Sequence, residues 1–167
     1  MKRLILMRHA KSDWSGAGVS DHDRTLNDRG RRDAAALGQW LRIKGLAPDT
    51  VLCSSATRTR QTVDLLGLDG TPDVVLTRAL YLADAEELHA ALCEATGETV
   101  LLVAHNPGIG DMAEMIVDAE PNPDGLHHYP TGATLVATFQ IDDWADLKWQ
   151  SGHVTHRIVP RDLAAPE

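Results

Sequence analysis

The feature that most constrains the fold of this chain is its alternation of short apolar runs with segments of helical periodicity. Apolar runs occupy residues 4–7, 51–53, 74–77 and 99–104. Runs of this length, bounded by turn residues, are typical of buried β-strands. Strands that alternate with helices predict an α/β fold whose central sheet is largely parallel.

Helical patterns fill the first two intervals between these runs. Residues 30–44 repeat their apolar side chains with a helical period, and Gly45 follows as a natural end point. Ser54 or Ser55 can cap a second helix that runs to about residue 68, because a serine hydroxyl accepts from the free N–H groups of the first turn.

Two further helix starts carry their own signals. Asp84 and Glu87 stand three positions apart ahead of an apolar periodic segment, which is the spacing of a capping box. Asn106 and Pro107 fit an N-cap followed by proline at the first helical position, and they predict a helix to about residue 117.

The C-terminal third of the chain predicts two more strands. Residues 132–141 alternate apolar and polar side chains, and a last strand is expected within residues 148–159, paired with the first as an antiparallel addition. The expected architecture is a three-layer sandwich, a mostly parallel sheet flanked by helices. We expect one domain over residues 1–160 and a C-terminal tail over residues 161–167.

The charge of the chain argues against several classes of partner. A formal net charge of −8 and a pI of about 5.4 do not suit non-specific nucleic-acid binding, which depends on a basic surface. The apolar run at residues 4–7 is too short for a signal-peptide core, and no run reaches the length of a membrane span. We therefore expect a cytoplasmic protein that binds neither nucleic acid nor membrane.

Basic and imidazole side chains follow three of the predicted strands. Arg8 and His9 come directly after the first strand, Arg58 lies just beyond the second, and His105 follows the fourth. Ligands in open α/β sheets bind outside the carboxyl ends of the strands, so these side chains should meet at one edge. Arginine binds two oxygens of a phosphoryl group at once, and a neutral imidazole is a nucleophile near pH 7. The set indicates a phosphate-handling site.

Three segments carry a resemblance to a known family. They are LILMRHAKS at residues 4–12, SSATRTRQT at residues 54–62 and VLLVAHNP at residues 100–107, in family order, with DHDRTL at residues 21–26 as a further match. The chain resembles the histidine phosphatase superfamily, which is phosphoglycerate-mutase-like, and within it the small bacterial phosphohistidine phosphatases. The resemblance spans residues 4 to about 159 and implies a phosphoglycerate-mutase-like fold.

The resemblance assigns roles to individual residues. It implies that His9 is the phosphorylated nucleophile, that Arg8 and Arg58 clamp the phosphoryl oxygens, and that His105 contacts the phosphoryl group during transfer. Ser12 stands where the family often places a hydroxyl near the phosphate. The implied enzyme is a metal-independent phosphatase that uses no cofactor.

Two positions depart from the family pattern, and one residue is a candidate acid. Ala10 replaces the usual glycine, so its backbone should not need a positive φ. Ser15 replaces the asparagine of the mutase branch, which weakens an interpretation as a glycolytic mutase. Glu86 is the candidate for a substrate-binding carboxylic acid that protonates the leaving oxygen, because Asp84 and Glu87 already serve a helix cap.

The substrate is the question that the sequence leaves open. Short connections predict an open site, which favours phosphohistidine on a protein such as a histidine phosphotransfer protein. The alternatives are a small phosphate ester, hydrolysed by a phosphomonoesterase, and a phosphate-binding module that lacks catalysis.

Three remaining features are given no functional role. The GxGxxA pattern at residues 108–113 lacks the acidic strand end of a dinucleotide site, so no nucleotide cofactor is expected. His127 and His128 lack the spacing of metal ligands, and so does His22.

Overall fold

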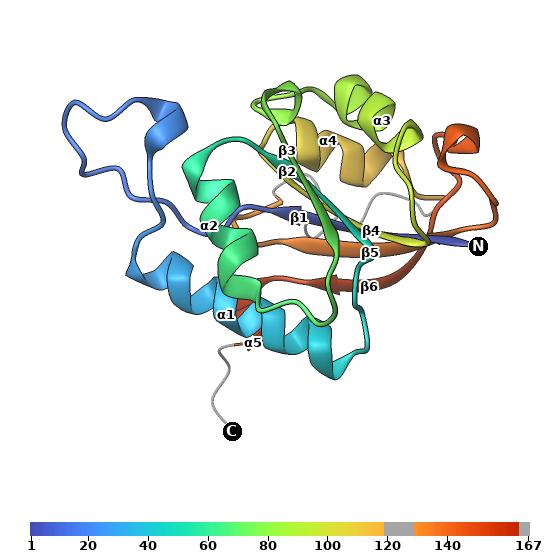
Figure 1. Cartoon of the computed structure of the whole chain (residues 1–167), viewed down its shortest axis with the longest axis horizontal. Coiled ribbons are helices and arrows are strands. Elements are labelled where there is room, and N and C mark those ends of the chain that lie inside the picture. The colour runs from blue at the N-terminus through green and yellow to red at the C-terminus, as the bar shows by residue number, and fades with distance from the viewer. Residues whose placement is uncertain (119–128, 164–167) are drawn as a thin grey trace.

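A six-stranded sheet in the order β3-β2-β4-β1-β5-β6 runs through the middle of the computed structural model, which describes residues 1–118 and 129–163 (Figure 1). Neighbours among β3, β2, β4 and β1 are parallel, whereas β5 pairs antiparallel with both β1 and β6. The predicted parallel sheet with an antiparallel addition is therefore confirmed. The strands are β1 (Lys2–Arg8), β2 (Thr50–Ser54), β3 (Asp73–Thr77), β4 (Thr99–Ala104), β5 (Thr134–Phe139) and β6 (His153–Ile158).

Helices cover both faces of this sheet and complete the predicted three layers. α1 packs with α2 and α5 on one face, and α3 packs with α4 on the other (Figure 1). The α-helices are α1 (Asp28–Ile43), α2 (Thr57–Leu66), α3 (Ala85–Cys93), α4 (Gly108–Met115) and α5 (Pro160–Leu163). Short 3-10 helices in the described part of the chain are η1 (Asp21–Asp23), η2 (Arg78–Leu80) and η4 (Trp144–Asp146).

Strand β1 shows why the apolar runs lack alternation. Leu4 and Leu6 pack into the cluster beneath α3 and α4, while Ile5 and Met7 pack into the cluster beneath α1 and α2. A parallel strand covered by helices on both faces needs apolar side chains at successive positions. The carboxyl end of β1 is thereby fixed in the centre of the sheet, next to the end of β4.

Two predicted helix starts are wrong. Neither Ser54 nor Ser55 caps α2: the N-cap is Ala56, without a side-chain cap, because the Ser54 hydroxyl is engaged elsewhere. Helix α4 begins at Gly108 and not at Pro107, while the Asn106 Oδ1 atom accepts from the Gly110 N–H at 3.1 Å. This asparagine therefore stands one position before the N-cap, Pro107, and accepts from the N–H of the third helical residue.

Other sequence signals have the predicted effect. Asp84 and Glu87 form the capping box of α3, and Gly45 follows α1 with a φ of +68°. Ala10 is absent from the positive-φ positions of the described chain, as its replacement of glycine predicts. Residues 161–163, predicted as the start of the tail, continue α5. Residues 119–128, with His127 and His128, lie outside the described residues.

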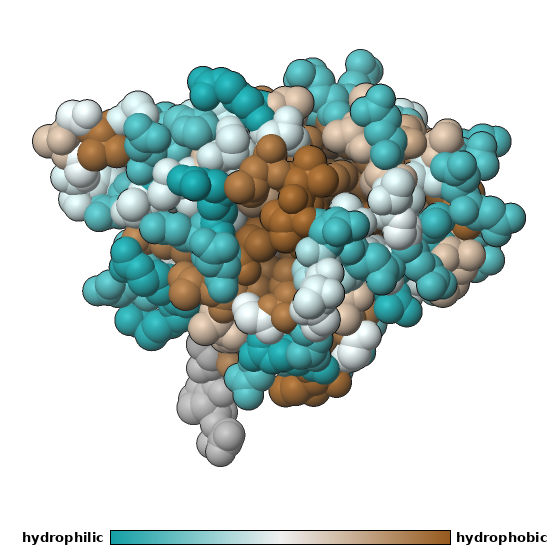
Figure 2. Space-filling view, in the orientation of Figure 1, coloured by the Kyte–Doolittle hydropathy of each residue, from teal (hydrophilic) through white to brown (hydrophobic). Residues whose placement is uncertain are grey.

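Strand β3 forms one edge of the sheet and carries an exposed apolar surface. Val74, Val75 and Leu76 are each about half exposed. Figure 2 shows the corresponding apolar patch near the middle of the face on which Figure 1 places β3. The strand was predicted from its apolar residues, but periodicity does not distinguish an edge strand from a buried one.

Candidate active site

His9 and His105 lie side by side because they follow two paired strands. Arg8 is the register partner of Ala104 in the parallel β1–β4 pair, and each histidine is the next residue along its chain. Their ring centroids are 5.3 Å apart, and their exposed fractions are only 4% and 2%. The sheet thus brings together two histidines that are 96 positions apart, as the strand-end argument predicts.

The hydrogen bond of His9 determines which ring nitrogen is free. His9 Nδ1 lies 2.7 Å from the carbonyl oxygen of Ala10. A carbonyl can only accept, so in the neutral ring Nδ1 carries the hydrogen and Nε2 keeps its lone pair. The Ala10 N–H itself donates to Thr62 Oγ1 at 3.1 Å, which fixes this turn against α2. The geometry leaves the lone pair of Nε2 free.

Both imidazoles are neutral at pH 7. Burial lowers the pKa of His9 to about 3, and the positive charges of Arg8 and Arg58 act in the same direction. Burial, followed by the Arg58 charge, lowers the pKa of His105 to about 3. A histidine held neutral by its surroundings keeps the lone pair that nucleophilic attack requires.

These shifts predict an acid-sensitive fold. The unfolded chain has imidazole pKa values near 6.5, so below that pH it binds protons that the folded protein does not bind until about pH 3. The free energy of unfolding should therefore fall as the pH drops through this window, by up to about 1.4 kcal/mol per pH unit for each histidine. Urea unfolding at a series of pH values measures the slope. The double variant His9→Gln, His105→Gln should flatten the dependence of the unfolding free energy on pH. The control His153→Gln, at an exposed position, should not change it. An unchanged slope in the double variant would contradict the account.

Both predicted arginines have hydrogen bonds that fix their side chains. Arg8 donates from Nη1 to the Tyr129 carbonyl at 3.3 Å. Arg58, in the first turn of α2 and 2% exposed, donates from Nη1 to the Asp21 carbonyl at 2.6 Å and from Nη2 to Asp21 Oδ2 at 3.1 Å. Desolvation lowers the pKa of Arg8, followed by repulsion from Arg58. Two like charges are thus held near each other, as an anion site requires.

Three buried nitrogens mark the place where an anion fits. Among the described residues, the buried side-chain nitrogen and oxygen atoms without a hydrogen-bond partner are Arg8 Nε, Arg58 Nε and His105 Nδ1. Leaving a buried polar group unpaired is costly, and native proteins rarely do so away from functional sites. All three belong to the residues that the sequence assigns to the phosphate site. Phosphoryl oxygens are acceptors that match the two guanidinium N–H groups.

Ser54 orients His105. Ser54 Oγ lies 2.7 Å from His105 Nε2 and also accepts from the Ala56 N–H at 3.3 Å. A hydroxyl can donate its hydrogen to Nε2 while its oxygen accepts from the backbone. The neutral ring then carries its hydrogen on the unpaired Nδ1, where it can donate to an anion. Sequence reasoning missed this role, since it treated Ser54 as a candidate helix cap.

The remaining predicted residues are placed differently. Ser12 is buried, and its hydroxyl accepts from Arg24 Nη1 at 2.6 Å. Arg24 also donates to Asp21, which binds Arg58. Glu86 is exposed in the first turn of α3, and the described hydrogen bonds and ion pairs do not join it to Arg8, His9, Arg58 or His105.

Sequence reasoning also missed three residues around Arg58. Asp21 binds Arg58, and the Tyr81 hydroxyl donates to the same carboxylate. The sequence assigns no role to His22. Its Nε2 atom lies 2.8 Å from Ser55 Oγ, and its ring packs edge-on against Tyr81. Asp21 and His22 lie within the DHDRTL segment of the resemblance, so that segment was the available signal. Tyr81 had none.

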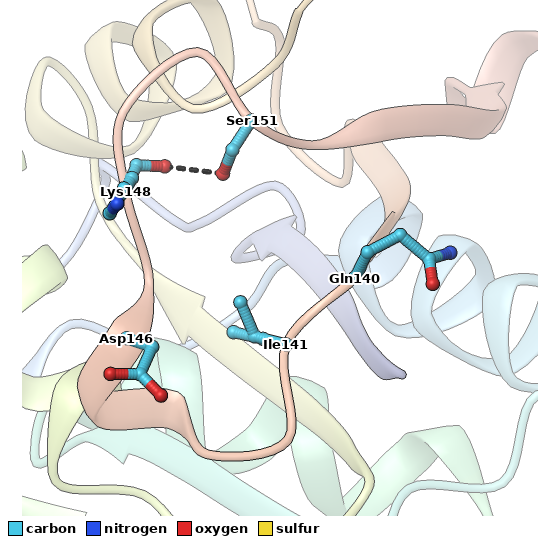
Figure 3. A pocket seen from close by; sticks show the side chains of 5 residues that line it. All are labelled: Gln140, Ile141, Asp146, Lys148 and Ser151. Carbon is cyan, nitrogen blue, oxygen red and sulfur yellow. Dashed lines mark hydrogen bonds between the residues drawn. The ribbon is translucent and has the colours of Figure 1, made fainter.

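A hollow lies at the end of the sheet opposite to His9. It has a volume of about 350 Å³ and is lined by Gln140, Ile141, Asp146, Lys148 and Ser151 (Figure 3). Gln140 follows Phe139, which pairs with Lys2 at the amino end of β1, whereas His9 follows the carboxyl end. The predicted residues do not line this hollow, so it is separate from the candidate active site.

The described residues show neither a candidate metal cluster nor a membrane-spanning helix. Within residues 1–118 and 129–163, no group of three or more His, Cys, Asp or Glu side chains is arranged to hold a metal ion. Over the same residues, none of the helices has the length and apolar character needed to cross a bilayer.

A family model and two bacterial relatives match this chain. A family model described as the histidine phosphatase superfamily (branch 1) matches residues 4–89, which include Arg8, His9 and Arg58. An uncharacterized protein of Mycobacterium leprae is 34% identical over 166 residues, covering 93% of this chain and all of that protein. An uncharacterized protein of Mycobacterium tuberculosis is 36% identical over 163 residues, with 93% of this chain and 100% of that protein covered.

Two solved structures resemble nearly the whole chain. One described as a proposed phosphohistidine phosphatase SixA from Nakamurella multipartitia has a TM-score of 0.83 and 34% identity, covering 95% of this chain and 96% of that one. A second proposed SixA, from Agrobacterium tumefaciens, has a TM-score of 0.79 and 28% identity, covering 95% of this chain and 98% of that one. The likeness extends over nearly the whole chain in both cases.

Proposed function

Because the chain belongs to the histidine phosphatase superfamily, we propose that it hydrolyses phosphohistidine on a protein through a phosphoryl group carried on His9. The observation that carries the proposal is the set of three buried, unpaired nitrogens on Arg8, Arg58 and His105 beside the His9 ring. Phosphoryl transfer depends mainly on positioning and on stabilising charge, and this set supplies both.

In the first step, His9 Nε2 attacks phosphorus in line with the leaving group. A P–N bond to His9 forms while the bond between phosphorus and the leaving atom breaks, and the leaving group departs with the electron pair of that bond. Arg8 and Arg58 bind the equatorial oxygens, and His105 donates from Nδ1. The Nδ1–H to Ala10 hydrogen bond stabilises the positive charge that develops on the His9 ring.

In the second step, water attacks the same phosphorus atom. A P–O bond forms, the P–N bond breaks, and His9 regains its lone pair while the water proton passes to phosphate or solvent. The two arginines and His105 stabilise the transition state again. We propose that no metal takes part, since the guanidinium groups provide the positive charge that a metal ion supplies in other phosphatases.

The substrate class follows from the proton that each leaving group needs. An alkoxide must be protonated as it departs, whereas an imidazole leaves more readily. Of the carboxylates in the described chain, Asp21 binds Arg58 directly, and its pKa of about 2 means that it carries no proton at neutral pH. Glu86 makes no described bond to the site. This chemistry favours phosphohistidine, and the likeness to structures described as SixA phosphohistidine phosphatases supports it.

A side-by-side assay tests the proposal. The purified protein is given a phosphorylated histidine phosphotransfer protein and, separately, a panel of alkyl phosphomonoesters, all in excess EDTA. We expect kcat/KM for the phosphohistidine protein to exceed that for the esters by about 10²-fold or more, the size of a general-acid contribution that the esters lack.

Three results would contradict parts of this proposal. Equal or higher kcat/KM on an alkyl ester would favour a phosphomonoesterase for a small metabolite. Loss of turnover in EDTA that Mg²⁺ or Zn²⁺ restores would exclude the metal-independent mechanism. Binding of inorganic phosphate without any hydrolysis would indicate a phosphate-binding module.

A further inference from the structure

Asp21 is the point at which three elements of the site are joined. Its carboxylate accepts from Arg58 Nη2 at 3.1 Å, from Arg24 Nε at 3.2 Å and from the Tyr81 hydroxyl, and its carbonyl accepts from Arg58 Nη1 at 2.6 Å. Asp21 lies in η1, Arg58 in α2, and Tyr81 directly after η2. Its partners are up to 60 positions away in sequence. One residue therefore connects the loop after β1 to the helix after β2 and to the turn after β3.

These bonds leave a defined part of the Arg58 guanidinium for substrate. A guanidinium has five N–H hydrogens. Asp21 accepts one from Nη1 and one from Nη2. The remaining hydrogens are one on each terminal nitrogen and the one on Nε, and Nε is buried without a partner. Asp21 thus fixes the plane of the guanidinium while Nε–H stays available to a phosphoryl oxygen.

Asp21 is ionised at neutral pH. Burial alone raises the pKa of this carboxyl, but hydrogen bonds from Tyr81 and Arg58 outweigh burial and lower it to about 2. The carboxylate is about half exposed, whereas the Arg58 side chain is almost fully buried. A partly exposed carboxylate thus fixes the position of a buried guanidinium. The same guanidinium is proposed to bind the phosphoryl anion as well.

The same carboxylate is linked to the loop that follows His9. Arg24, which donates to Asp21 Oδ1, also donates from Nη1 to Ser12 Oγ at 2.6 Å. Ser12 stands three residues after His9. A continuous chain of hydrogen bonds thus runs from Arg58 through Asp21 and Arg24 to Ser12, on the loop that follows the nucleophile.

We propose that Asp21 is a positioning residue for phosphoryl transfer: it orients Arg58 toward the group on His9 by accepting one hydrogen from each terminal nitrogen of the guanidinium. The inference rests on the proposed function, because it assigns Arg58 to the transferring phosphoryl group. Asp21 acts through Arg58 and does not touch substrate. Its removal should therefore reduce kcat while anion binding is largely kept, since Arg58 retains its charge.

The test uses Asp21→Asn, which keeps the side-chain shape and the backbone carbonyl. With 4-nitrophenyl phosphate as substrate, we expect kcat to fall about 10- to 100-fold, the cost of small misplacement of a catalytic group. The inhibition constant of inorganic phosphate should change less than about five-fold, the scale of an exposed ion pair. Asp21→Glu should restore part of the kcat. Asp23→Asn is the matched control, because Asp23 lies on η1, is exposed and contacts only His22 by its side chain among the described residues.

A double-mutant cycle shows whether Asp21 acts through Arg58. In the Arg58→Ala background, adding Asp21→Asn should cost less than about two-fold further activity, because contacting residues are not additive. The inference is overturned if Asp21→Asn keeps the wild-type kcat, if it costs the same factor in both backgrounds, or if phosphate inhibition weakens in step with kcat. The His9→Ala variant in the same assay reports on the proposed function separately: hydrolysis that depends on His9 but not on Asp21 would refute this inference alone.

Discussion

Replacing His9 with alanine is expected to lower kcat for 4-nitrophenyl phosphate by at least about 10⁴-fold, the scale seen when a covalent nucleophile is deleted. The reason is that His9 Nε2 has the free lone pair, and the buried ring stays neutral down to about pH 3. No neighbouring group can replace it in the same position, since His105 Nε2 is bound to Ser54.

The measurement is steady-state hydrolysis with the variant purified from a host that lacks background phosphatase activity. His153→Ala serves as the control, because His153 is an exposed histidine on β6 and should retain wild-type activity. Retention of more than a few per cent of kcat by His9→Ala would mean that water attacks phosphorus directly or that another residue is the nucleophile.

Arg58→Ala should reduce kcat/KM by about 10³-fold, since removal of one preorganised donor to a developing oxyanion costs about 10²- to 10³-fold and here a buried charge is lost with it. Arg58→Lys keeps the charge but has no Nε–H in the same place, so it should recover only a small part of the loss. Arg60→Ala, an exposed arginine of the same helix, is the control and should be unaffected. A lysine variant with full activity would show that charge alone matters and that the guanidinium geometry does not.

The sequence predicted the sheet and the edge at which the site lies because both depend on local pattern. Apolar runs without alternation identified the parallel strands, and parallel strands place their carboxyl ends together. Arg8, His9, Arg58 and His105 follow those ends, so they could be grouped before their distances were known.

The parts that could not be predicted depend on loop conformation. Asp21 contacts Arg58 across 37 positions and Tyr81 across 60, and no periodicity in the sequence reports on such contacts. The capping prediction for Ser54 failed for a related reason. A serine hydroxyl serves a backbone N–H or an imidazole equally well, and only the tertiary structure shows that His105 lies within reach.

The choice of an acid depends on distances that the sequence does not contain. Glu86 was selected by elimination, after Asp84 and Glu87 had been assigned to the capping box that the structure shows. Elimination on one helix carries no information about distance to the site. The structure instead places a carboxylate, Asp21, against Arg58, where its low pKa suits it to orient a cation and not to donate a proton.

The central claim is that phosphate is carried on His9, and trapping that intermediate tests it most directly. The protein is incubated briefly with substrate bearing a radiolabelled phosphoryl group, quenched without acid, digested, and the labelled peptide is sequenced by mass spectrometry. The account predicts label on His9 that survives alkali, is lost in acid as a phosphoramidate should be, and is absent from the His9→Ala variant. Label that is stable in acid and lost in alkali, or label on another residue, would contradict it.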